Sequence, residues 1–114
     1  MHEMSLTEGV IRILEDQAAT HGFAKVKTVW LEIGDLSNVD PESMLFCFDA
    51  IAKGSPVAAG AKLEVIRVPG QAFCLSCGQG VAASNRFDPC PECGGFGLRI
   101  TAGEEMRIKE LEVE

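Results

Sequence analysis

The sequence predicts an α+β protein in which two helices pack on a small three-stranded sheet, with a four-cysteine domain inserted into the chain. Three observations predict it. Apolar residues recur at helical spacing in two segments, three other segments have strand-like patterns, and the composition changes abruptly at Gly70. With 114 residues, 46% of them hydrophobic and 24% charged, the chain has an ordinary globular composition and can bury one sizeable core.

Two segments have the apolar spacing of amphipathic helices. The first is predicted over 5–21, where Ser5 opens a Ser-x-x-Glu capping box and Gly22 supplies the stop. Residues before Ser5 are expected to lie outside this helix. The second is predicted to begin near Asp40, which can serve as the N-cap, with Pro41 in the first helical position.

The three predicted strands cover residues 25–33, 61–68 and 106–113. In the last strand the apolar alternation shifts by one residue between Ile108 and Leu111, which indicates a bulge or a twist. The cysteine-rich segment falls between the second and third strands. We therefore predict one domain formed by 1–69 and 104–114, and an inserted domain over 70–103.

The charge pattern narrows the classes of partner. Ten basic residues against seventeen acidic residues give a net charge of −7, and no cluster of Lys or Arg is present. Nucleic-acid binding normally needs such a cluster, so we expect no nucleic-acid partner. The apolar runs are too short to span a membrane, and the opening residues have no secretory pattern, so we expect a cytoplasmic protein.

Four of the five cysteines form two Cys-x-x-Cys pairs: Cys74, Cys77, Cys90 and Cys93. Two such turns facing each other make a tetrahedral sulfur cage, which is the geometry of a structural zinc site. Glycine follows each pair, at Gly78 and Gly94, where it permits a left-handed turn. We therefore predict a zinc-ribbon-like domain in which Zn(II) replaces a core that residues 70–97 are too poor in aliphatic residues to build.

Two other interpretations of these cysteines stay open. Iron can occupy the same sulfur cage, and the two pairs can instead be redox-active dithiols. A structural zinc ion would not by itself indicate what the protein does. Cys47 shares a predicted helical face with Met44 and is expected to be a buried apolar residue, as are Trp30 and the six phenylalanines.

The N-terminal tripeptide Met1-His2-Glu3 is a second candidate metal site. The amine of Met1, the backbone nitrogen and ring of His2 and the backbone nitrogen of Glu3 can surround one cation in a plane. All-nitrogen tetragonal ligation suits Ni(II) or Cu(II). The alternative is a solvated terminus with no ligand.

The order of these motifs resembles one known family. Met1-His2-Glu3, the Ile-Gly-Asp-Leu-Ser turn over 33–37, Phe-Cys-Phe over 46–48 and the paired cysteines occur together. Over essentially its whole length the chain resembles the HypA/HybF family of hydrogenase-maturation nickel metallochaperones. The two cysteine motifs are common elsewhere, but their combination with the N-terminal Met-His-Glu is specific.

The resemblance implies a protein that binds Ni(II) at its N-terminus and delivers it to the large subunit of a nickel-iron hydrogenase, working with a maturation GTPase. It implies that His2 is the essential nickel ligand with Glu3 as its neighbour, and that the four paired cysteines bind zinc. Asp40 lies where some relatives have a residue near the nickel. Some members also supply urease. A homodimer is a further possibility.

We expect no enzymatic activity, because the sequence contains no Ser-His-Asp set, paired-carboxylate motif or phosphate-binding loop. The alternative to a nickel metallochaperone is a zinc-ribbon protein-interaction module without nickel transfer. A small thiol oxidoreductase is a third hypothesis, and it requires cysteines that are not all bound to metal.

Overall fold

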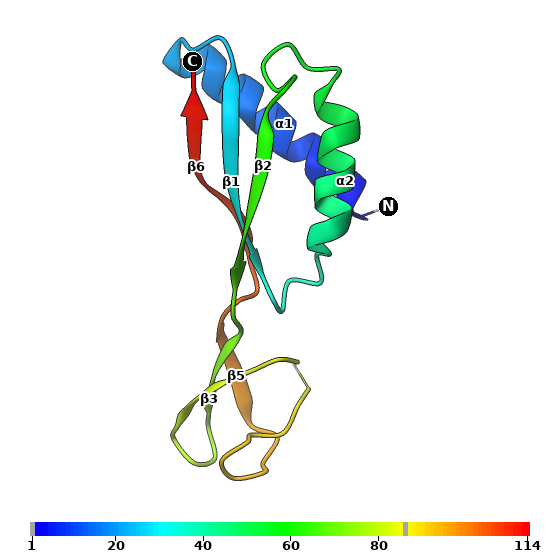
Figure 1. Cartoon of the computed structure of the whole chain (residues 1–114). Helices are drawn as coiled ribbons and strands as arrows, with labels where there is room; N and C mark the ends of the chain where they lie inside the picture. Colours follow the sequence, from blue (N-terminus) through cyan, green and yellow to red (C-terminus); the bar gives the residue numbers. More distant parts are fainter. Residues whose placement is uncertain (1, 86) are drawn as a thin grey trace. The chain divides into compact units, whose positions relative to one another are not determined.

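The computed structural model describes residues 2–85 and 87–114, which form two compact units (Figure 1). The described residues of the helical unit are 2–31, Asp40–Ile66 and Arg107–Glu114. The cysteine unit comprises Glu32–Val39 and Arg67–Met106. The predicted functional division, with nickel bound by 1–69 and 104–114 and zinc by 70–103, stays a prediction.

The helices and the first sheet of this α+β fold are α1 (His2–His21), β1 (Val26–Gly34), α2 (Pro41–Ala52), β2 (Lys62–Val68) and β6 (Met106–Val113). The strand order is β2-β1-β6, and α1 contacts α2. Fully buried side chains come from both helices and from β1: Leu14, Val29, Leu31, Met44 and Cys47. The predicted fold class is confirmed, and Cys47 is buried as expected.

Helix α1 begins earlier than the sequence predicted. It starts at His2, so Ser5 lies inside the first turns and the predicted capping box there is wrong. The Thr7 hydroxyl donates to the Glu3 carbonyl oxygen (2.7 Å) and lies 3.6 Å from the Met44 sulfur, with Thr7 fully buried. Packing of this turn against α2 therefore extends the helix past the local start signal.

Helix α2 begins as the sequence predicted. Asp40 is the N-cap, with an extended backbone, and Pro41 occupies the first helical position. The Asp40 carboxylate accepts from the Glu42 N–H (3.2 Å) through one oxygen and from the Ser43 hydroxyl (2.8 Å) through the other. These bonds satisfy donors that the helix leaves unpaired at its N-terminus.

The cysteine unit has a second sheet that the sequence analysis missed. Its strands are β3 (Gln71–Cys74), β4 (Gly80–Ala82) and β5 (Leu98–Ala102), in the antiparallel order β4-β3-β5. The unit also has a small core, made by Leu36, Ala72, Cys74, Val81, Ala83 and Cys90 with Leu98 and Ile100 against it. The expectation that 70–97 has no core is corrected in part, because Leu36 from outside this segment completes the cluster.

The phenylalanines are distributed differently from the prediction. Phe48 is buried, but four others are exposed: Phe46, Phe73, Phe87 and Phe96. Three of these four lie in the cysteine unit, where the core is too small to take them. No helix of the described residues is long and apolar enough to cross a membrane.

Candidate metal centre

The two Cys-x-x-Cys turns have the same backbone geometry. In the first, the Gly78 N–H donates to the Cys74 carbonyl (2.8 Å) and the Cys74 N–H donates to the Gln79 carbonyl (2.9 Å). The second turn repeats both bonds over 90–95, at 2.8 and 2.7 Å. Gly78 and Gly94 have φ values of 72° and 73°, the left-handed conformation predicted for them.

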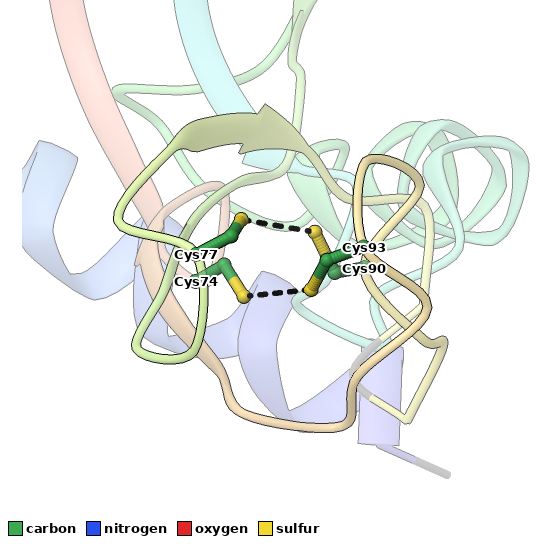
Figure 2. A group of neighbouring side chains, drawn as sticks. All are labelled: Cys74, Cys77, Cys90 and Cys93. Atoms are coloured by element: carbon green, nitrogen blue, oxygen red, sulfur yellow. Dashed lines mark hydrogen bonds between the residues drawn. The ribbon is translucent and has the colours of Figure 1, made fainter.

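The four predicted thiols converge on one point (Figure 2). Their sulfur atoms all lie within 4.8 Å of one another, with Cys74–Cys93 at 3.6 Å and Cys77–Cys90 at 3.8 Å. A tetrahedral zinc ion with Zn–S bonds of about 2.3 Å requires sulfur–sulfur separations of about 3.8 Å. The donor set therefore fits a tetrahedral thiolate-bound metal ion with small shifts of the sulfur atoms.

Ionisation of these thiols is unequal. The backbone N–H of Cys77, and then that of Ser76, lower the pKa of Cys74 to about 6. For Cys77 the Gln79 N–H lowers the pKa, but burial and the neighbouring sulfurs outweigh it and raise the pKa to about 12. The neighbouring sulfurs thus disfavour ionisation of Cys77 and Cys93, and a bound cation would favour it.

The cage offers four sulfur ligands and no other kind of donor. Within the described residues, it is the one group of at least three His, Cys, Asp or Glu side chains placed to hold a metal. Cys74 and Cys90 are buried, whereas Cys77 and Cys93 are exposed. The Gly95 N–H points to the Cys93 sulfur at 3.4 Å, as is common for metal-bound thiolates.

The described residues of the predicted N-terminal site do not form a cluster of side chains like that of the four cysteines. Met1 lies outside the described residues, and His2 is exposed at the first position of α1. The Glu3 carboxylate accepts a hydrogen bond from the Asp40 N–H (3.2 Å), which, with its own backbone N–H, holds the pKa of Glu3 below its usual value. The sequence did not predict this hydrogen bond between Glu3 and the residue that caps α2. Its one signal was an acidic residue near the start of α1, and that does not identify a partner 37 residues away.

Fold and cysteine cage together define a small α+β metal-binding protein with an all-cysteine centre. The family described as "Hydrogenase/urease nickel incorporation, metallochaperone, hypA" matches residues 1–113. The chain belongs to this HypA family.

Curated relatives match the chain from end to end. Hydrogenase maturation factor HypA of Albidiferax ferrireducens is 57% identical over 114 residues, covering 100% of both chains. Its counterpart from Rhodopseudomonas palustris is 55% identical over the same length, again covering 100% of both. The solution structure of the Ni metallochaperone HypA from Helicobacter pylori has a TM-score of 0.71 at 25% identity, covering 97% of this chain and 96% of that one.

Proposed function

We propose that the chain binds Ni(II) at its N-terminus and delivers it to the large subunit of a nickel-iron hydrogenase. A maturation GTPase is the proposed partner, and a homodimer is the proposed assembly. The observation that carries the proposal is the family match over 1–113, whose description is nickel incorporation. Exposure of His2 at the first position of α1 supports it, because cargo has to enter and leave.

Zinc is the metal proposed for the four-cysteine cage, with Cys74, Cys77, Cys90 and Cys93 as its ligands. The sulfur separations of 3.6 and 3.8 Å support this assignment. A closed all-thiolate tetrahedron has no position for substrate, so the proposed role of zinc is structural: when bound, the ion would join the two turns.

The proposed nickel ligands are the Met1 amine, the backbone nitrogen and ring of His2, and the backbone nitrogen of Glu3. The first N–H groups of a helix have no acceptor inside it, and they point in one direction. Because α1 begins at His2, these amide nitrogens are not used by the helix. The Glu3 carboxylate is bonded to α2, which favours its backbone nitrogen over its side chain as the ligand.

Asp40 is not included among the proposed nickel ligands. Each of its carboxylate oxygens accepts a hydrogen bond from the first turn of α2. Its interpretation as the helix cap is confirmed, and both of its oxygens are engaged in that role.

A calorimetric Ni(II) titration of untagged, zinc-loaded protein tests the site. His2→Ala should weaken binding by about tenfold or more, since an imidazole ligand and its chelate ring are lost. His21→Ala, at the other end of α1, is the matched control and should bind as the native chain does. Equal binding by both variants would reject the N-terminal site.

A second titration tests whether the Met1 amine is a nickel ligand. A short N-terminal extension converts the Met1 amine to an amide and should weaken Ni(II) binding about as much as His2→Ala does, about tenfold. The same extension after Glu114 should change nothing. Circular dichroism serves as the folding control, because the extension precedes the first turn of α1.

Delivery requires its own measurement. Nickel content of a hydrogenase large subunit, produced in cells that lack their own maturation factor of this family, should rise when this chain is supplied and fail to rise with His2→Ala. Zinc retention with no nickel binding would instead favour the interaction-module alternative.

A further inference from the structure

Two of the four cage cysteines are accessible to solvent and two are not. Cys74 and Cys90, the first cysteines of the two turns, are 0% and 2% exposed. Cys77 and Cys93, the second cysteines, are exposed. Oxidation of a cysteine requires contact between its sulfur and the oxidant, so susceptibility follows exposure. A reagent that arrives from solvent therefore meets Cys77 or Cys93 before the buried pair.

Short distances between sulfur atoms connect the two turns. Figure 2 shows the Cys74 sulfur next to that of Cys93 (3.6 Å) and the Cys77 sulfur next to that of Cys90 (3.8 Å). Each pair combines an exposed cysteine with a buried one. A sulfenic acid formed on the exposed member thus has a second sulfur beside it, which is the arrangement that gives a disulfide.

The two exposed cysteines differ in the residue that follows the turn. The turns have the same backbone hydrogen bonds, but the residue two positions after the exposed cysteine is Gln79 in the first turn and Gly95 in the second. The Gly95 N–H points to the Cys93 sulfur, and a Cβ built on Gly95 would lie 3.4 Å from that sulfur. The missing side chain therefore leaves this side of the Cys93 sulfur uncovered.

The charges around Cys93 select the kind of oxidant. Glu92 precedes it directly and is exposed, residues 87–98 contain no Lys or Arg, and the net charge of the chain is −7. These charges repel an anionic oxidant such as glutathione disulfide, whereas a neutral peroxide approaches without that penalty. Hydrogen peroxide is the simplest oxidant of this class.

We propose that Cys93 is an oxidation site: a neutral peroxide converts it to a sulfenic acid, Cys74 closes a disulfide with it, and the cage opens. The Cys93 thiolate attacks one peroxide oxygen, the O–O bond breaks and hydroxide leaves. The Cys74 thiolate then attacks the Cys93 sulfur and expels a second hydroxide. The two sulfurs lose two electrons, the peroxide gains them, and each hydroxide takes a proton from the buffer to become water.

The disulfide forms by approach of the two turns. The Cys74 and Cys93 sulfurs have to move from 3.6 Å to about 2.05 Å apart. The hydrogen bonds from Gly78 to the Cys74 carbonyl and from Gly94 to the Cys90 carbonyl lie within single turns, so the new bond does not replace them. Two of the four thiolate donors are lost, so the cage should release its metal ion. A dithiol reductant should restore both donors.

Tryptic peptides distinguish this disulfide from its alternatives. Trypsin releases residues 68–86 and 87–99 as separate peptides, each with one Cys-x-x-Cys pair. Untagged, zinc-loaded chain is treated with hydrogen peroxide, quenched with catalase, alkylated and digested without reduction. The expected first product joins the two peptides through Cys74 and Cys93, and it should form in step with zinc release to a chromogenic chelator. Cys47, buried in the helical unit, should stay reduced.

A reciprocal exchange between the turns provides matched variants. Gly95→Gln gives the second turn the residue of the first, and Gly95 has no positive φ that would forbid it. This variant covers the Cys93 sulfur and should slow zinc release by peroxide several-fold. Gln79→Gly uncovers the first turn and should increase the yield of the bond between Cys77 and Cys90. Both variants keep all four cysteines, so their zinc content before treatment should equal that of the native chain.

Glutathione disulfide at the same concentration tests the choice of oxidant, and it should release zinc several-fold more slowly than peroxide does. Four results would overturn the proposal. Zinc and all thiols could survive peroxide. The first disulfide could lie inside one turn, or could join Cys77 to Cys90. Gly95→Gln could react as fast as the native chain. Glutathione disulfide could act as fast as peroxide.

The proposal rests on the proposed zinc ion only for the release measurement. Elemental analysis before treatment tests the zinc assignment separately, and peptide mapping detects the disulfide whichever metal the cage holds. The experiment uses no nickel, so its result is independent of the proposed nickel delivery.

Discussion

The helical unit and the cysteine unit are held together by different means. In the helical unit, large apolar side chains such as Leu14, Leu31 and Met44 have no exposure, and they come from separate elements. In the cysteine unit, the core contains two cysteines and two alanines, while Phe87 and Phe96 are 85% and 80% exposed. The helical unit buries large apolar side chains in its core, whereas the cysteine unit has a core of mostly smaller side chains and leaves two phenylalanines largely in water.

This difference indicates where each unit obtains its stability. Burial contributes about 25 cal/mol per Å² of apolar surface, so a core of small side chains contributes little. Metal ligation by four thiolates contributes on the order of 10 kcal/mol, which is sufficient to fold a segment of that size. The comparison predicts that metal removal and core truncation act on different units.

The largest expected effect is loss of the metal. Cys74→Ala, or treatment with a strong chelator, should abolish hydrogen-exchange protection in β3, β4 and β5 and release the metal, because on the order of 10 kcal/mol of ligation is lost. Cys47→Ala is the matched cysteine control and should retain the metal. Freshly purified protein without zinc by elemental analysis would contradict the assignment.

Core truncation comes next in magnitude. Leu14→Ala should destabilise the helical unit by about 2–5 kcal/mol, since it leaves a cavity at a fully buried position. Urea unfolding followed by helical circular dichroism measures it, and zinc content should be unchanged. If Leu14→Ala reduced hydrogen-exchange protection equally in both units, the two units would unfold together. That result would contradict the prediction that core truncation acts on the helical unit alone.

The cap of α2 should have a smaller effect. Asp40→Ala removes the acceptor for the Glu42 N–H and the Ser43 hydroxyl, and should cost about 1 kcal/mol. Asp40→Asn retains an acceptor and should cost less in the same urea experiment. If both substitutions prove neutral, the cap contributes nothing to stability.

The smallest expected effect is a pH dependence from Glu3. The pKa of this carboxyl is lowered in the folded chain, so its contribution is present at neutral pH and is lost as pH falls through the folded pKa. Native chain and Glu3→Gln should differ slightly in stability at pH 7 and converge in acid. A difference that persists in acid would show that the hydrogen bond from Asp40 does not depend on the charge.

Sequence patterns correctly predicted the start of α2 and the geometry of the two Cys-x-x-Cys turns, because neighbouring residues in the chain determine both. Asp40 and Pro41 determine the start of α2 through their own chemistry, and the Cys-x-x-Cys spacing places both thiols of a pair on one side of a turn. The left-handed conformation of Gly78 and Gly94 follows from the same turn geometry.

Other parts depend on contacts between distant residues. The early start of α1 depends on Thr7 packing near Met44, which no local pattern shows. Strands β3, β4 and β5 are four, three and five residues long, which is too short for their alternation to stand out among the surrounding glycines and cysteines. The phenylalanines of the cysteine unit were wrongly assigned to a core because composition does not state how large that core is.

The position of Leu36 has a practical consequence for protein engineering. This residue precedes α2 in the chain, yet it lies in the core of the cysteine unit together with Ala72 and Val81. A cassette of residues 70–103 exchanged between family members would therefore carry the four paired cysteines but would leave behind Leu36, a side chain that belongs to their core. Domain grafting from this family should transplant 32–39 together with the cassette, as two matched pieces from the same donor.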